Sequence, residues 1–314
     1  MSNDLDDIFN DDLPPDHRSG FVAVVGRPNV GKSTLINRIL GQKIAIVTNK
    51  PQTTRKRQLG IYTQDNGQVM FIDTPGLHRP HHKLGEYMIE VAEYAIKDAD
   101  IILWVLDVST PPQESDMYIA DTLMRLRDDA PVILVLNKSD LIGQNADLTA
   151  HTNLIPHLQA MRVSAMTGAG VDDLLNIVIE HMPLGPRYYP ADQVSEVNMR
   201  FIAAEIIRER IIENTEQEIP YSVAIEIEEY KERSDDLTYI NATIYVERES
   251  QKGILVGKNG NMIKQIGVEA RQALSEATGT RIYLDLHVKV LKDWRSNIPL
   301  LRRLGYRLSR EDDN

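Results

Sequence analysis

The residues most clearly able to do chemistry lie in "GRPNVGKST" at 26–34, which fits the pattern G-x-x-x-x-G-K-[ST]. An apolar run precedes this stretch and a helical pattern follows it, as in a loop that surrounds phosphate with backbone N–H groups. In such a loop Lys32 would reach the β- and γ-phosphates of a nucleotide, and the Ser33 hydroxyl would be a Mg²⁺ ligand. The residues expected to line the phosphates are Gly26, Arg27, Pro28, Asn29, Val30, Gly31, Lys32, Ser33 and Thr34.

A second group of residues could sense a γ-phosphate. In "DTPG" at 73–76, Asp73 ends an apolar run, so its carboxylate is expected to hold Mg²⁺ through water, while the Gly76 N–H faces the γ-phosphate. The polar, non-periodic stretch 51–60 predicts a loop, in which Thr54 is the expected second protein ligand of Mg²⁺ and Thr53 the alternative. The predicted metal ligands are Ser33, Thr54 and Asp73, and the predicted catalytic set is Asn29, Lys32, Thr54 and Gly76.

The identity of the base is indicated by "NKSD" at 137–140 and "SAM" at 164–166. Asp140 offers two acceptors to the N1–H and 2-amino donors of guanine, whereas adenine has no proton at N1. Asn137 would orient the loop and contact the base edge, the Lys138 stem would lie on the purine, and the Ala165 N–H would reach guanine O6. The remaining residues expected at the nucleotide are Asp73, Thr74, Pro75, Gly76, Leu77, Asn137, Lys138, Asp140, Ser164, Ala165 and Met166.

These segments must be positioned by a sheet, and the apolar runs indicate which kind. Short, β-branched runs predict buried strands, and they alternate with helical patterns, which implies an α/β domain whose mostly parallel sheet is covered on both faces. The expected strands are 21–25, 69–73, 101–107 and 131–137, and the expected helices are 32–40, 83–98, 114–127 and 171–181. The proline-rich stretch "MPLGPRYYP" at 182–190 predicts a linker over 183–196.

A different order of elements follows the linker and predicts a small α+β domain over 197–308. Its expected elements are a helix at 197–214, strands at 221–230 and 239–247, a helix at 262–277, a strand at 281–291 and a short helix near 298–304. Between the second strand and the long helix, "GKNG" at 257–260 fits the G-x-x-G loop with which KH domains clamp single-stranded RNA. With the helix that precedes the loop, the order is α-β-β-α-α-β.

Charge supports an RNA-binding end. Residues 251–310 carry 12 Lys and Arg against 4 Asp and Glu, a local charge of +8, in a chain whose net charge is −11. A basic module on an acidic body is expected where one part meets a polyanion. A solvated charged face, with an ordinary helix–helix turn at "GKNG", is the alternative. The residues predicted to contact RNA are Gly257, Lys258, Asn259, Gly260, Lys264, Lys289, Arg302 and Arg303.

Composition excludes several other classes of protein. The chain has 314 residues, of which 42% are hydrophobic and 26% charged, and it contains no cysteine, so disulfides and thiolate metal sites are excluded. No apolar run approaches the length of about 18 residues that a membrane span requires. Residues 1–20 contain six Asp and no apolar run, which predicts a disordered acidic tail rather than a signal peptide.

Together, "GRPNVGKSTLIN", "QTTR", "DTPGLH", "NKSD" and the following G-x-x-G segment resemble the translation-factor-related GTPases that assist ribosome assembly and carry a C-terminal KH domain. The resemblance runs from residue 21 to about residue 308. It implies a P-loop GTPase domain over 21–182, a type II KH domain, and slow hydrolysis of GTP to GDP and phosphate. It also implies binding of 16S rRNA near its 3′ end in the 30S subunit, no DNA partner, a monomer and a cytoplasmic location, and it leaves peripheral contact with the inner face of the cell membrane open.

One departure from Ras-like enzymes bears on mechanism. Leu77 stands where those enzymes keep a glutamine, and leucine cannot orient water. In relatives with this replacement, an asparagine in the P-loop coordinates a K⁺ ion beside the phosphates, and Asn29 holds that position here. The resemblance therefore implies K⁺ as a second cofactor beside Mg²⁺.

Other functions remain as alternatives. An RNA chaperone or adaptor could bind GTP without a hydrolytic cycle, but Thr54, Asp73 and Gly76 argue for sensing of the γ-phosphate. A metabolic P-loop kinase ranks lowest, because no lid for an acceptor substrate is visible and "NKSD" specifies guanine. His78, His81 and His82 are interpreted as a solvated loop rather than a metal site, since no carboxylate or cysteine completes the set.

Overall fold

The computed structural model describes residues 13–42, 45–48, 50, 53–77, 80, 82–195 and 198–307. The chain divides into two compact units. The first unit contains Met1–Ala45, Thr54–Arg79 and Met88–Glu196, and the second contains Ile46–Thr53, Pro80–Tyr87 and Val197–Asn314. Two short segments, 46–53 and 80–87, therefore belong with the C-terminal unit although the chain on both sides of each belongs to the first.

The first unit is built on a six-stranded sheet with the order β2-β3-β1-β4-β5-β6. All neighbouring strands are parallel except β2 and β3, which are antiparallel, so the predicted mostly parallel sheet is confirmed. The strands β1, β3, β4 and β5 correspond to the four apolar runs, whereas β2 and β6 were not predicted. Their bounds are β1 Arg18–Val25, β2 Gln58–Gln64, β3 Gly67–Asp73, β4 Ile101–Asp107, β5 Val132–Asn137 and β6 Gln159–Arg162.

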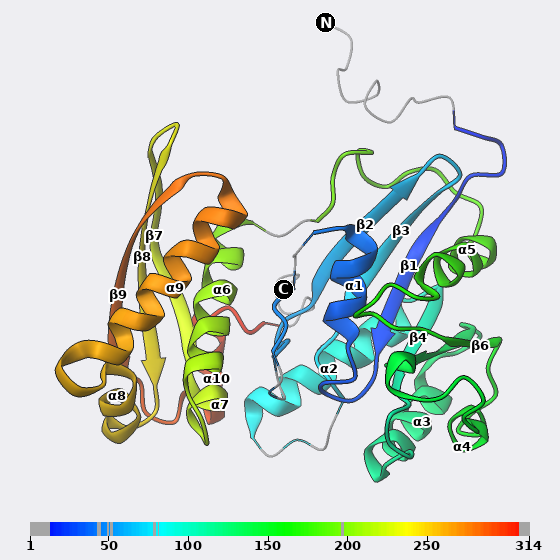
Figure 1. Cartoon of the computed structure of the whole chain (residues 1–314), viewed down its shortest axis with the longest axis horizontal. Helices are drawn as coiled ribbons and strands as arrows, with labels where there is room; N and C mark the ends of the chain where they lie inside the picture. The colour runs from blue at the N-terminus through cyan, green and yellow to red at the C-terminus, as the bar shows by residue number, and fades with distance from the viewer. Residues whose placement is uncertain are drawn as a thin grey trace, which may run out of the picture. The chain divides into compact units, whose positions relative to one another are not determined.

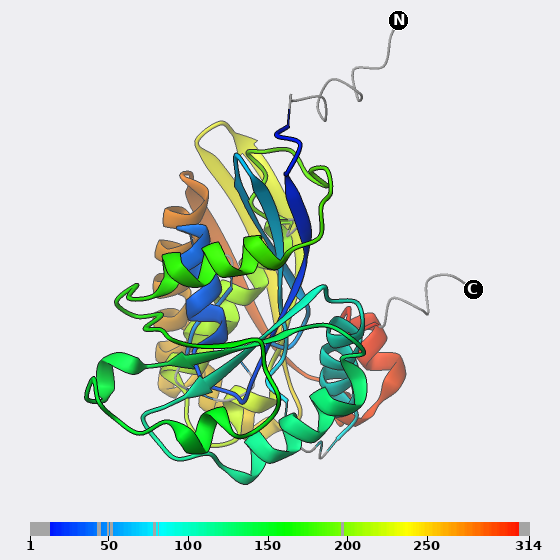
Figure 2. The same cartoon turned by 90° about the vertical axis from the view of Figure 1, so that its right-hand side faces the viewer.

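Helices cover both faces of this sheet (Figures 1 and 2). On one face, α1 (Lys32–Leu40) and α5 (Val171–His181) bury their apolar side chains against the strands, and on the other α2 (Lys83–Lys97) and α3 (Glu114–Leu126) do the same. The two cores share no residue, because side chains alternate between the faces of each strand. The short elements η1 (Ser139–Leu141) and α4 (Thr149–Thr152) lie between β5 and β6 along the chain.

The structure differs from the predicted boundaries of the first domain. The expected tail of residues 1–20 is too long, because β1 begins at Arg18 and the His17 ring bonds to the carbonyl oxygen of Gly185 at 2.7 Å. The expected linker packs against the first unit: the Ser19 N–H donates to the Pro183 carbonyl and the Ile61 N–H to the Val194 carbonyl. Residues 183–195 therefore continue the first unit. Residues 1–12 of the predicted tail lie outside the described residues.

The second unit confirms the predicted α+β domain. Its three-stranded sheet has the order β7-β8-β9, antiparallel between β7 and β8 and parallel between β8 and β9. Helices α6 and α9 pack against one face of the sheet around a shared core (Figure 1). The elements are α6 Met199–Asn214, α7 Ile219–Ser222, β7 Ala224–Ser234, β8 Leu237–Val246, α8 Glu249–Val256, η2 Lys258–Gly260, α9 Asn261–Thr278, β9 Arg281–Val290, η3 Trp294–Ser296 and α10 Ile298–Arg303. Within the described part of the chain, no helix is long and apolar enough to cross a membrane.

Candidate nucleotide site and RNA-binding loop

The phosphate-binding loop joins the end of β1 to the start of α1. Gly31 is the N-cap residue of α1 and has φ of 100°, a left-handed conformation that favours glycine. A Cβ at Gly31 would also lie 2.3 Å from the side-chain nitrogen of Asn137, so no larger residue fits. The loop predicted from the sequence is therefore built as a tight turn at a helix N-terminus, where an anion is stabilised.

Lys32 lies inside this loop and is 6% exposed. Its Nζ donates to the carbonyl oxygens of Gly26 at 3.1 Å and Arg27 at 2.8 Å. Burial lowers the pKa of Lys32 to about 8, although Asp73 acts in the opposite direction. A phosphate group beside this poorly hydrated ammonium would favour its charged form, so the side chain is suited to bind an anion.

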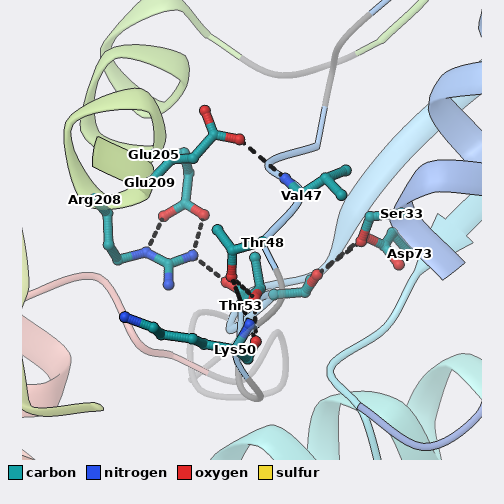
Figure 3. A network of polar contacts seen from close by, with 10 residues as sticks. Ser33, Val47, Thr48, Lys50, Thr53, Asp73, Glu205, Arg208 and Glu209 are labelled. Carbon is teal, nitrogen blue, oxygen red and sulfur yellow. Dashed lines mark hydrogen bonds and ion pairs between the residues drawn. The ribbon is translucent and has the colours of Figure 1, made fainter. Parts of the chain in front are cut away.

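Three oxygen-bearing side chains converge beside Lys32. The Ser33 hydroxyl donates to Asp73 Oδ2 at 2.8 Å, the Thr54 hydroxyl donates to the same oxygen at 3.2 Å, and the two hydroxyl oxygens lie 3.1 Å apart. Figure 3 shows the contact between Ser33 and Asp73. Thr53, the alternative ligand, instead bonds to the Thr48 hydroxyl and to the Lys50 carbonyl, both at 2.7 Å. The structure thus brings together the three residues predicted to hold Mg²⁺.

The chemistry of this set fits magnesium. Asp73 is fully buried, and its Oδ1 has no hydrogen-bond partner among the residues that the structure describes, which is costly unless a ligand occupies that side. Burial raises the pKa of the Asp73 carboxyl, against the smaller lowering effects of Lys32, Ser33 and Thr54. One carboxylate and two hydroxyls are oxygen ligands of the kind that Mg²⁺ prefers. No cluster of three or more His, Cys, Asp or Glu suited to a metal occurs among the residues that the structure describes.

The "DTPG" segment closes against the phosphate-binding loop. A Cβ at Gly76 would lie 2.7 Å from the Pro28 nitrogen, so glycine is required for this close approach. The Leu77 N–H donates to the Gly26 carbonyl at 3.3 Å. The Leu77 side chain is fully buried in the core between the sheet and helices α2 and α3. Leu77 therefore has a packing role and cannot orient an attacking water. Thr74 is also buried, and its hydroxyl donates to the Val24 carbonyl at 2.8 Å.

Asn137 connects the base-reading segments to the phosphate-binding loop. Its side-chain nitrogen donates to the Val30 carbonyl at 2.7 Å, and its side-chain oxygen accepts from the Ala165 N–H at 2.9 Å. The orienting role predicted for Asn137 thus has a geometric basis. In this structure the Ala165 N–H, expected to reach guanine O6, is directed at Asn137. Asp140 is exposed in η1, where a ligand can reach it.

The G-x-x-G segment joins α8 to α9. Gly257 ends α8, Gly260 is the N-cap residue of α9, and η2 lies between them with Asn259 at φ of 55°. The side chains of Lys258 and Asn259 are exposed, as is that of Lys264 on α9. The loop therefore presents two polar side chains at the N-terminus of an 18-residue helix, the arrangement expected for phosphate contact.

Comparison with known proteins gives the family. Residues 21–138 match the family described as "50S ribosome-binding GTPase", and residues 218–295 match "KH domain". The chain is 48% identical to GTPase Era of Geotalea uraniireducens over 292 residues, which cover 92% of this chain and 98% of that protein. GTPase Era of Geotalea daltonii is 45% identical over 291 residues, covering 92% and 97%. The chain belongs to the GTPase Era family.

Solved Era structures match the whole length. A variant of Aquifex aeolicus Era, with one tyrosine replaced by alanine and bound to GDP·AlF4⁻, is 36% identical, with a TM-score of 0.85 over 93% of this chain and 100% of that one. An Era in complex with MgGDPNP and nucleotides 1506–1542 of 16S ribosomal RNA is also 36% identical, with a TM-score of 0.86 and the same coverage. Both units of this chain therefore have counterparts in Era, so the chain is a GTPase with a KH domain.

Two of the remaining predicted RNA contacts, Lys289 and Arg303, form ion pairs with carboxylates of β7. On β9, Val288 and Val290 pack toward the core, so Lys289 between them faces away from α6 and α9. Lys289 pairs with Glu228 at 3.3 Å, and Arg303 pairs with Glu226 at 3.2 Å. Arg302 is exposed on α10. The RNA contacts of Lys289, Arg302 and Arg303 stay a prediction.

Sequence reasoning missed residues that support the Era-family nucleotide site. Asp116 is 1% exposed and pairs with Arg27 of the phosphate-binding loop at 2.8 Å, while its other oxygen accepts from the Gln113 N–H at the start of α3. Asp107 pairs with Lys138 at 2.6 Å. Burial raises the pKa of the Asp107 carboxyl, but hydrogen bonds from Lys138 and Ser109 together lower it below its usual value. Neither pairing has a local sequence signal, because the partners lie far apart along the chain.

The histidines after "DTPGL" divide between described and undescribed residues. His82 accepts a hydrogen bond from the Gly85 N–H at 3.0 Å through its ring Nδ1, at the start of α2. This contact gives His82 a local structural role. His78 and His81 lie outside the described residues.

Proposed function

We propose that the chain hydrolyses GTP at the site around Lys32 with Mg²⁺ and binds single-stranded 16S rRNA near its 3′ end through "GKNG" during 30S assembly. The first part rests on the Ser33 and Thr54 hydroxyls, which converge on buried Asp73. Within the described part of the chain, the other oxygen of Asp73 has no hydrogen-bond partner. The Era structure with MgGDPNP and 16S rRNA nucleotides, similar over the full length, supports both parts.

Each residue of the site then has a role. Lys32 would turn its ammonium from the Gly26 and Arg27 carbonyls toward the β- and γ-phosphates, and Asp140 would pair with the guanine edge. Mg²⁺ would be held by Ser33, Thr54 and Asp73. When bound, it would neutralise negative charge on the β- and γ-phosphates. The Gly76 N–H would report the γ-phosphate, so that GTP and GDP are distinguished. Since Leu77 is buried, no side chain follows Gly76 to orient water, and slow hydrolysis is expected.

We expect hydrolysis to be faster in K⁺ than in Na⁺, and Asn29→Ala to remove this difference. The reason is that buried Leu77 leaves the developing negative charge without a glutamine, and a cation held by Asn29 would supply the missing stabilisation. Asn29 has φ of 64°, so its side chain sits on a turn of the phosphate-binding loop. The measurement is the single-turnover rate in the two salts. Equal rates in wild type, or a K⁺ effect that persists in Asn29→Ala, would rule out the potassium site.

Replacing Lys258 and Asn259 together by Asp should weaken RNA binding while leaving GTP binding unchanged. Both side chains are exposed, so the fold should persist, and the new carboxylates would repel phosphate. Each lost phosphate contact should flatten the log–log salt dependence of binding to single-stranded RNA by about 0.7. RNA affinity at several salt concentrations, beside GTP affinity, gives the answer. Unchanged RNA binding would make the loop an ordinary helix–helix turn.

A second variant tests the RNA contact that the sequence predicts on the other face of the sheet. Lys289→Asp removes a basic side chain that already pairs with Glu228 and faces away from α9. A larger loss of RNA affinity in Lys289→Asp than in the loop variant would move the RNA site to that face. The finer predictions of a monomer, a cytoplasmic location and peripheral membrane contact rest on the resemblance alone.

A further inference from the structure

Helix α6 carries charged side chains that are as buried as its apolar ones. Ile207 and Ile211 pack into the core of the second unit and are fully buried, yet Arg208 and Glu209 are only 2% and 1% exposed. Arg and Glu are almost never fully buried unless they are paired. Their hydrogen-bond partners therefore show what covers this side of the helix.

The covering element is the segment 46–53, which belongs with the second unit. Glu209 Oε1 accepts from the Val47 N–H at 3.1 Å, and the Arg208 guanidinium donates to the Thr53 carbonyl oxygen (Figure 3). The Lys50 ammonium donates to the carbonyl oxygen of Ile212 at 2.6 Å and also to that of Thr215. Lys50 thus supplies a positive charge at the C-terminal end of α6, where one is favourable.

Both residues in the contact between Arg208 and Thr53 make further hydrogen bonds. On the helix, Glu205 Oε1 accepts from Arg208 Nε at 3.0 Å, which fixes the plane of the guanidinium. On the segment, the Thr53 hydroxyl lies 2.7 Å from that of Thr48 and donates to the Lys50 carbonyl at 2.7 Å. The Thr53 carbonyl is therefore fixed by two independent sets of contacts.

Thr54 follows Thr53 directly, and its hydroxyl is the one that bonds to Ser33 and Asp73. We propose that Arg208, assisted by Glu209 and Lys50, is a positioning residue for GTP hydrolysis that fixes the Thr53 carbonyl and so keeps the Thr54 hydroxyl at the magnesium site. This inference rests on the proposed function. A residue that acts one peptide bond from a metal ligand can have a large effect, because a misplacement of about 1 Å can cost about a hundredfold in rate.

The test compares Arg208→Gln and Lys50→Met with wild type in the full chain. Both variants should lower kcat for GTP hydrolysis and raise the Mg²⁺ concentration for half-maximal rate, each by at least about tenfold. Their affinity for GDP should stay at the wild-type value, because Thr54 is expected to act only when a γ-phosphate is present. Lys50→Met changes no residue of α6 and leaves Arg208 and its partner Glu205 in place, so it keeps the test valid if Arg208→Gln does not fold.

Arg200→Gln is the matched control. Arg200 is an exposed arginine on the same helix whose guanidinium donates to the Ile227 carbonyl at 3.2 Å, away from the segment. This variant should keep the wild-type kcat and Mg²⁺ dependence. Wild-type kcat and Mg²⁺ dependence in both test variants, or an equal loss of GDP and GTP affinity, would overturn the inference. Absence of Mg²⁺-dependent GTP hydrolysis in wild type would instead overturn the proposed function.

Discussion

Asp140→Asn should lower the affinity for GTP by about a thousandfold, equivalent to several kcal/mol, and should favour xanthine nucleotides. The substitution replaces one carboxylate oxygen by an amide NH2 group, which is a hydrogen-bond donor. This donor cannot pair with the N–H donors of guanine, but it can pair with the carbonyl that xanthine carries in place of the 2-amino group. Asp140 is exposed, so the substitution should leave the fold intact. Equilibrium binding of GTP and xanthosine triphosphate gives both affinities.

Asp147→Asn is the matched control for this substitution. Asp147 also lies between β5 and β6, is exposed, and bonds only to the N–H and hydroxyl of Thr149 among the contacts of the described residues. Its replacement should change neither affinity. If Asp140→Asn binds GTP as wild type does, "NKSD" does not read guanine and the base is recognised elsewhere.

Asp73→Asn should slow GTP hydrolysis by about a thousandfold, or about 4 kcal/mol, because the carboxylate that would hold Mg²⁺ is lost. The remaining amide oxygen can still accept from the Ser33 and Thr54 hydroxyls, so the local structure should persist. Single-turnover hydrolysis across a range of Mg²⁺ concentrations measures the effect. A variant with the wild-type rate and Mg²⁺ dependence would show that Asp73 is not at the metal site.

Much of the fold follows from the apolar runs, and the two missed strands show where that signal ends. The runs at β1, β3, β4 and β5 are buried on both faces, so their sequences are almost wholly apolar. In contrast, β2 is "QLGIYTQ" and β6 is "QAMR", and both lie at edges of the sheet. An edge strand is stabilised largely by pairing with its neighbour, which composition does not reveal.

The candidate site was predictable where its residues lie in short motifs. Ser33, Asp73 and Thr54 each stand in such a motif, and the structure brings all three together. Asp116 was not predictable as a partner of Arg27, since 89 residues separate them. The charges of α6 would be interpreted as a solvated face, because only the tertiary structure shows that segment 46–53 covers Arg208 and Glu209.

The central claim is tested most directly by measuring phosphate release from GTP and from ATP. Each nucleotide is supplied at the same concentration, with Mg²⁺, to the purified full chain. We expect phosphate release from GTP that stops when Mg²⁺ is chelated, because of buried Lys32 and the oxygen ligands around Asp73. Because the exposed carboxylate of Asp140 pairs with guanine, we expect no release from ATP above background. Equal release from both nucleotides, or no release from GTP, would contradict the assignment of a guanine-specific, magnesium-dependent GTPase site.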